Sequence, residues 1–348
     1  MVGLNQDEKS YLNSMGITLK EVNALSADDL SSYIQQAKAN SFNPQIFQQF
    51  IKETIKYKQA SHPDLSQSVT LDINGNFKTP YGIMPNRYKN SKPADFAASD
   101  SLATVKSYTG SIRDNVNPGD QTGTYYCVKS ATGYKEATAF ATLPTISSMA
   151  STDRAYMMLN VNTTDSAVVS DYGVVYSPGI GWFPCINAYY WNGTTYVGAT
   201  GTTNGWWAGS TFTAPQVYLD VKVTHNSSND TVELIVRDAS TWAVLADHTV
   251  TYSGDKIYSG YTNINIYHET TMAQNNSGTL NTNTGSYFYN AQMSQAYLYN
   301  SAGYYLWGTS QTSDAYKQAP TSRQLATVTV NPYTKWDSDT VAIRFNVP

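Results

Sequence analysis

The stretch from Ile264 to Glu269 holds the side chains best suited to chemistry. Side chains alternate between the two faces of a strand, so Asn265, Tyr267 and Glu269 share one face. The two isoleucines and His268 share the opposite face. On the concave outer face of a sheet, the first group could present two polar groups and one carboxylate to a sugar. Glu269 is therefore a candidate catalytic acid or nucleophile.

Glu269 would need a second carboxylate to act as a glycosidase. Retaining enzymes place two carboxylates about 5 Å apart, on either side of the scissile bond. Asp171, Asp220 and Glu233 lie on three other predicted strands, and the spacing selects none of them. An ordinary exposed strand carboxylate fits the same pattern, so both interpretations of Glu269 stay open.

Adjacent aromatic residues give a different signal. Trp206 and Trp207 follow one another, and neighbours on a strand cannot both face the core. Tyr190 lies in a similar aromatic run. Exposed rings of this kind offer sugars a flat apolar face and a polar tip. The pattern predicts a carbohydrate-binding surface that includes Trp206, Trp207, Tyr190, Tyr267 and Asn265, although such rings can also fill the edges of a sandwich.

Motifs for metals and nucleotides are weak. No two of the four histidines have the i, i+4 spacing of a helical zinc site, and no glycine-rich loop precedes a helix. No cofactor is expected. A structural calcium ion is conceivable because Asp337 and Asp339 are oxygen ligands near a turn, but simple turn residues explain them equally well.

The charge content restricts the partners. Charged residues make up 14% of the 348 residues, well below the roughly 25% usual for soluble domains. No lysine- and arginine-rich stretch could follow a phosphate backbone, so nucleic acid is not an expected partner. No apolar run approaches the length of a membrane span. A surface of tyrosine, threonine, serine and asparagine is typical of secreted proteins, so the chain is expected outside the cell, with any leader removed.

The first 60 residues predict a small helical module. Gly16 is a helix C-cap candidate, Thr18 and Glu21 have capping-box spacing, and Ser26 can cap a helix that continues to Ala39. The pair Asn43-Pro44 is a further start signal. Such short helices need a packing partner. They form either a structural cap on the rest of the chain or a docking or pro-segment.

The remainder divides at about residue 118. Repeated prolines and weak periodicity over residues 61–118 indicate an extended linker that packs on the next domain. Residues 119–348 carry all seven tryptophans and alternating strand patterns, as in Val217 to Thr224. On the order of a dozen short strands without intervening helices predict an antiparallel two-sheet β-sandwich of the jelly-roll type. Cys127 and Cys185 lie in two of these strands, and either a disulfide or two buried thiols is consistent with the sequence.

Three strand segments carry a resemblance to known families. They begin at Asp171, Gly181 and Val217, and they read DYGVVYSP, GWFPCIN and VYLDVKVT. They resemble strands of concanavalin A-like lectins and glucanases. More narrowly, the part after residue 123 is similar to the YrpD-like family of secreted Bacillus proteins. This resemblance implies export and a sandwich fold, and it implies no particular chemistry.

Three functional hypotheses follow. The first is a secreted lectin-like protein that binds carbohydrate or cell-wall polymer through exposed aromatic side chains. The second is a polysaccharide hydrolase or lyase that uses carboxylates such as Glu269 on a concave sheet. The third is a structural or adhesive surface protein that docks through its helical module.

Overall fold

The helices come first in the chain, as the sequence predicts. A computed structural model describes residues 3–61, 70–71, 77–79, 82–84, 92–93, 111–116, 123–199, 210–274, 283–319, 326–331 and 336–345. Its helices are α1 (Gln6–Ser14), α2 (Ala27–Ala39) and α3 (Pro44–Gln59). Asn5, Ser26 and Asn43 cap them, each accepting a hydrogen bond from the backbone N–H three residues on.

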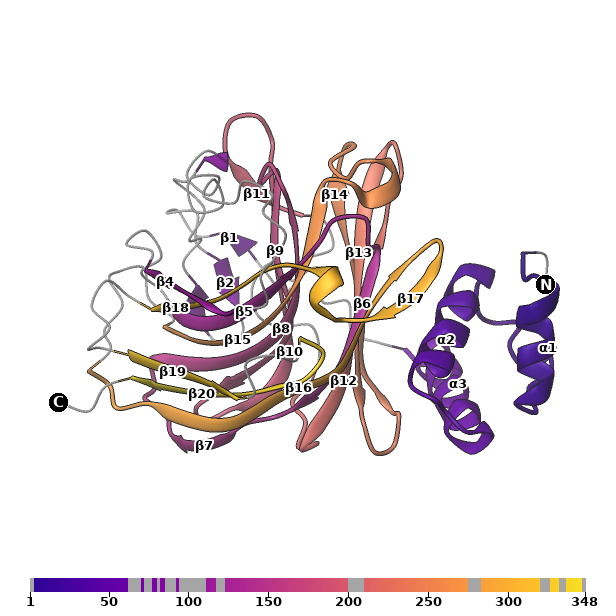
Figure 1. The fold of residues 1–348 in the computed structure, drawn as a ribbon, viewed down its shortest axis with the longest axis horizontal. Helices are drawn as coiled ribbons and strands as arrows, with labels where there is room; N and C mark the ends of the chain where they lie inside the picture. Colours follow the sequence, from indigo (N-terminus) through magenta and orange to yellow (C-terminus); the bar gives the residue numbers. More distant parts are fainter. Residues whose placement is uncertain are drawn as a thin grey trace.

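The sandwich consists of two large sheets, which confirms the predicted fold class (Figure 1). The first sheet has nine strands, of which seven follow the order β14-β13-β12-β6-β16-β20-β19, while β7 and β17 pair with β16. Their bounds are β6 (Glu136–Thr142), β7 (Thr145–Ser148), β12 (Gln216–Thr224), β13 (Asn229–Asp238), β14 (Val244–Ser253), β16 (Tyr287–Asn300), β17 (Gly303–Leu306), β19 (Ala326–Asn331) and β20 (Asp339–Phe345).

The second sheet has eight strands in the order β11-β10-β9-β8-β15-β5-β18-β4. Its pairings are antiparallel except for β18 with β4, which is parallel. The bounds are β4 (Arg113–Val116), β5 (Gly123–Ser130), β8 (Asp153–Thr163), β9 (Val168–Ser177), β10 (Gly181–Trp191), β11 (Tyr196–Gly198), β15 (Ile264–Gln274) and β18 (Thr312–Ala319). A separate three-stranded sheet contains β1 (Thr70–Leu71), β2 (Phe77–Thr79) and β3 (Gly82–Met84).

The core lies between the two large sheets and follows the alternation of their strands. In β12 the inward residues Val217, Leu219, Val221 and Val223 are buried in it, as the sequence predicts. The chain before β15 does not continue it as an extended strand. A 3₁₀ turn at Ser259–Tyr261, with positive φ at Gly260 and Tyr261, delays β15 until Ile264.

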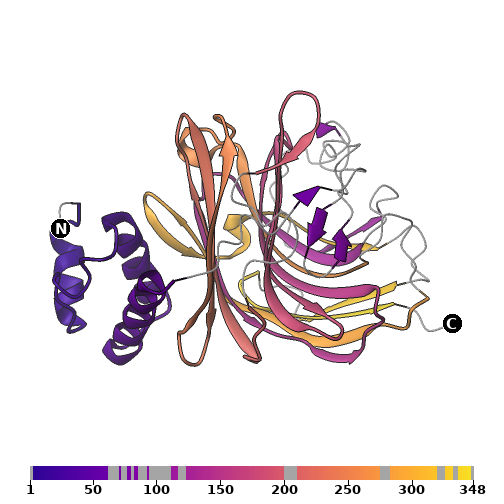
Figure 2. The ribbon, with the colours of Figure 1, turned by 180° about the vertical axis from the view of Figure 1, so that it is seen from behind.

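The helices pack on the outer face of the nine-stranded sheet, as both views show (Figures 1 and 2). Trp242, in the β13–β14 connection, is the centre of this contact. Its ring lies 4.7 Å from that of Phe42 and 5.5 Å from that of Phe50, measured between centroids. Tyr218 of β12 packs against the same tryptophan at 5.4 Å. The module thus shares one apolar cluster with the sheet.

The two cysteines lie on different strands of the eight-stranded sheet. Cys127 of β5 and Cys185 of β10 are both free thiols with no solvent exposure. Three strands separate β5 from β10 in the sheet order, which explains why the pair does not bridge. Of the two interpretations left open by the sequence, the structure shows buried thiols.

None of the helices in the described part of the chain combines the length and the apolar character that crossing a lipid bilayer requires.

Candidate functional site

Glu269 lies on the outer face of the eight-stranded sheet, where the alternation of β15 places it. Ile264, Ile266 and His268 point into the core, so the predicted division of faces is correct. One Glu269 carboxylate oxygen accepts a hydrogen bond from Asn160 Nδ2 at 3.2 Å, and the other accepts one from the hydroxyl of Thr271. Its neighbours are thus hydrogen-bond donors from its own strand and from β8.

Asn265 and Tyr267 share this face but are not exposed. Their side chains are 4% and 7% accessible. Asn265 Nδ2 donates to the carbonyl oxygen of Ser130 at 2.7 Å, and the Tyr267 ring lies 5.5 Å from the ammonium of Lys129. The expectation that these two side chains meet a sugar at the surface is therefore wrong for this structure. Alternation fixes the face of a residue but not what covers that face.

The proposed carboxylate partners of Glu269 divide between the two sheets. Asp220 and Glu233 lie on β12 and β13 of the opposite sheet, so they cannot share a cleft with it. Asp171 lies on β9, two strands away from β15. The register pairs Glu269 with Met158, and Met158 with Gly173, so the Cα atoms of Glu269 and Asp171 are roughly 12 Å apart. The backbone arrangement does not by itself create a catalytic pair.

The predicted aromatic surface is only partly described. Trp206 and Trp207 lie outside the described residues. Tyr190 is partly buried on β10, where its ring meets that of Tyr252 edge-on at 6.3 Å. The ammonium of Lys256 lies 5.6 Å from the Tyr190 ring. Tyr190 therefore packs mainly within the sandwich.

Asp337 and Asp339 do not belong to a group of three possible metal ligands in the part of the chain that the structure describes. Asp339 is buried on β20, and burial raises its pKa to about 8. Within the described residues, one group of three metal-ligand types occurs: His225, Asp230 and Asp255.

The His225 group has a structural explanation that needs no ion. Asp230 is fully buried and accepts hydrogen bonds from the backbone N–H groups of Asn226, Lys256 and Ile257. His225 Nδ1 lies 2.9 Å from the same carboxylate. These contacts occupy the lone pairs of the carboxylate and hold two turns together.

An open groove on the far part of the nine-stranded sheet is a site that the sequence analysis missed. It has a volume of about 240 Å³ and lies on β16, β19 and β20, away from the helices (Figure 1). The rings of Tyr287 and Tyr289 stack at 5.5 Å with an interplanar angle of 30°. The guanidinium of Arg344 lies 5.5 Å from the Tyr287 ring, and Thr327 and Thr329 line the opposite side.

The groove was missed because its residues come from distant parts of the sequence. Tyr287 and Arg344 face each other only because β16 pairs with β20, which in turn pairs with β19. Each strand shows only ordinary alternation, and residues 287 and 344 share no local motif. The two closely spaced tyrosines of β16 are the one signal available in the sequence.

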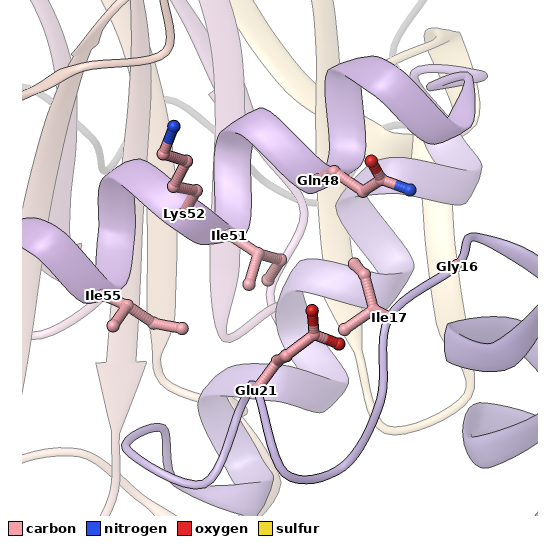
Figure 3. A pocket seen from close by; sticks show the side chains of 7 residues that line it. All are labelled: Gly16, Ile17, Glu21, Gln48, Ile51, Lys52 and Ile55. Carbon is pink, nitrogen blue, oxygen red and sulfur yellow. The ribbon is translucent and has the colours of Figure 1, made fainter.

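A second cavity lies within the helical module (Figure 3). It measures about 330 Å³, and its apolar lining comes from Ile17, Ile51 and Ile55. Glu21 and Lys52 add opposite charges to its lining. The adhesive hypothesis would be favoured by an apolar patch on this module. The three isoleucines that line this cavity form a small apolar patch.

Comparisons with known proteins concern the fold. No family model matches the sequence, and no curated protein matches it. Scytalido-glutamic peptidase, solved with a peptide-based transition state analog, is 11% identical with a TM-score of 0.36, and the match covers 65% of this chain and 99% of that one. SCP-B, a member of the Eqolisin family of peptidases in complex with a tripeptide, is 10% identical with a TM-score of 0.35 and the same coverage.

A third match is the CBM2 module of the Lactobacillus casei BL23 phage J-1 evolved Dit protein. It is 11% identical with a TM-score of 0.17, and the match covers 49% of this chain and 69% of that one.

Proposed function

We propose that this chain binds carbohydrate and that the ligand lies along the open groove of β16, β19 and β20. One observation carries the proposal: the stacked pair Tyr287–Tyr289 lies beside Arg344 on an outer sheet face that the helices leave open. The proposal keeps the lectin-like function inferred from the tyrosine-rich sequence and moves it to other residues.

The chemistry of the groove suits a sugar. Sugar rings have apolar C–H faces and polar edges, so they pack on aromatic rings while their hydroxyls make hydrogen bonds. Tyr287 and Tyr289 supply the aromatic surface, and both are only partly buried. Arg344, Thr327 and Thr329 are exposed and supply donors and acceptors at its edge. An open groove of this size accommodates a short part of a polysaccharide, and both ends of the polysaccharide can extend beyond it.

Extracellular location remains part of the proposal. The low content of charged residues and the similarity to the YrpD-like family of secreted Bacillus proteins support it. A polymer of the cell surface or cell wall is then the expected class of ligand.

The test is binding to a panel of soluble polysaccharides by affinity electrophoresis and calorimetry. Tyr287→Ala should weaken binding of any retained polymer by about tenfold, which corresponds to roughly 1.4 kcal/mol. Tyr258→Ala is the matched control, because that side chain is 54% exposed and lies outside the groove. The proposal fails if no polymer is retained, or if both variants lose affinity equally.

A further inference from the structure

The sheet face beneath the helical module is unusually polar for a buried surface. Glu136 of β6, Asp220 and Lys222 of β12, and Arg237 of β13 all point toward the helices. Each is less than a tenth exposed. Burying charged groups is costly unless each finds a partner, so a purely structural cap would favour apolar residues here.

Gln36 of α2 reaches into the middle of this face. Its amide nitrogen donates to Glu136 Oε1 at 3.0 Å and to Asp220 Oδ2 at 2.7 Å. Its amide oxygen accepts a hydrogen bond from the hydroxyl of Tyr218 at 3.2 Å. Ser32 Oγ donates to Glu136 Oε1 at 2.6 Å. Two carboxyl groups and one phenol therefore enclose a primary carboxamide, and we call Glu136, Asp220 and Tyr218 the carboxamide cradle.

The helical module does not provide a hydrogen-bond partner for every buried polar atom of this sheet face. Asp220 Oδ1 and Arg237 Nε, both buried on the sheet, have no hydrogen-bond partner. On the helical side, Tyr33 Oη and Asn40 Oδ1 are also buried and unpartnered. Buried polar atoms in native proteins nearly always have partners. The packing of α2 on this face therefore leaves hydrogen-bonding capacity on both the sheet and the helical module.

A single stretch of chain joins the module to the two large sheets. α3 ends at Gln59, and the next residues, Ala60 and Ser61, are exposed. The first strand of the two large sheets, β4, begins only at Arg113. A module with one covalent connection stays part of the chain even when its contacts with the sheet are broken.

We propose that the carboxamide cradle is a binding site for a peptide segment that presents a glutamine side chain, and that Gln36 occupies this site from within the chain. The helical module is then a removable cover. This site is separate from the proposed carbohydrate groove and lies on other strands of the same sheet.

The electrostatics favour a neutral amide over an ammonium group. Burial raises the pKa of Glu136 and of Asp220, and the charge of Glu136 raises the pKa of Asp220 further. The pair therefore holds a proton more readily than two exposed carboxyls would. Lys222 acts in the opposite direction and lowers the pKa of Glu136, but its charge is also shared with Asp28 at 2.6 Å and Asp29 at 3.1 Å on α2. The Tyr218 hydroxyl donates to an amide oxygen, whereas an ammonium group has no acceptor for that hydrogen bond.

The first experiment leaves the whole chain intact. Gln36→Ala removes the carboxamide, and Gln35→Ala, at the neighbouring partly buried glutamine, is the matched control. Propionamide at tenfold excess over its Kd should raise the Tm of the Gln36→Ala protein by roughly 2 °C and leave the control unchanged. Propionate and propylammonium should have no such effect. A shift caused by propylammonium, or by none of the three, would overturn the assignment.

The second experiment tests the cover. A specific protease site is inserted between Ala60 and Ser61, the chain is cut, and release of the helical fragment is followed by size-exclusion chromatography. The peptide acetyl-Ala-Gln-Ala-amide should increase release at least tenfold, and the same peptide with lysine or leucine at the centre should not. Asp220→Asn should remove the peptide effect. If no peptide releases the fragment, the module is a permanent part of the fold and the proposal is wrong.

Discussion

Asp339 should make this protein less stable as the pH rises, and Asp339→Asn should remove that dependence. The residue is 1% exposed on β20, and the raising effect of burial on its pKa exceeds the lowering effect of a backbone hydrogen bond from Met293. His268 lies beside it, with Nδ1 3.5 Å from Asp339 Oδ2, and the charge of Asp337 raises the pKa of Asp339 further. Burial lowers the pKa of His268 to about 4 and raises that of Asp339 to about 8, so both groups are neutral near pH 6 and the contact is not an ion pair.

The magnitude follows from the difference between the two states. An aspartate in the unfolded chain has a pKa of 3.8, against about 8 for Asp339 in the folded protein. Between these pH values the folded state holds a proton that the unfolded state has lost. The free energy of unfolding therefore decreases by up to about 1.4 kcal/mol per pH unit, and the stabilising contribution is lost as the pH rises to 8. Asparagine has a similar shape and cannot ionise.

The assay is urea denaturation of both proteins at intervals between pH 5 and pH 9. We subtract the free energy of unfolding of the unaltered protein from that of Asp339→Asn. This difference should increase by about 3 to 4 kcal/mol from pH 5 to pH 8 and then stay constant. The contribution of His268, which is lost as the pH falls from 6.5 toward 4, is present in both proteins and cancels. Parallel stability curves for the two proteins would show that Asp339 is solvated or ionised in the folded state, and would refute the argument.

Three further predictions concern packing and the thiols. Trp242→Ala should cost about 3 to 5 kcal/mol in urea denaturation, because its ring joins the helices to the sheet; a loss under 1 kcal/mol would mean the module contributes little. Gly173→Ala should destabilise the protein by at least about 1 to 3 kcal/mol, because the new Cβ would lie 2.2 Å from the carbonyl oxygen of Met157; unchanged Tm would contradict this close approach. Cys127 and Cys185 should react with a thiol reagent only after unfolding, because both are buried and burial raises the pKa of each thiol. An intact mass that does not change on adding reductant would confirm that the thiols are free. Fast labelling of the native protein would refute their burial.

Local sequence signals are correct where short-range physics decides the outcome. Ser26 and Asn43 cap their helices, and Gly16 adopts a positive φ after α1. Thr18 and Glu21 exchange their capping hydrogen bonds, yet only a turn follows them. Capping chemistry therefore identified the local contacts reliably, and the continuation of a helix depended on packing.

The site residues depended on information that the sequence does not contain. Tyr267 and Glu269 lie on the predicted face, but the burial of Tyr267 is set by what packs on that face. The groove around Tyr287 and Arg344 requires the pairing of β16 with β20, two strands separated by a long stretch of chain. No local pattern indicates which strands become neighbours.

The sequence by itself thus determined the classes of the elements, their capping and the inward face of each strand, because a side chain's direction follows from its position in the local backbone. The tertiary structure alone decided which outward faces stay open and which are covered. Gln36 shows the reason: its amide meets Glu136 and Asp220 across a large separation in the chain, and that contact exists only once the helices dock on the completed sheet.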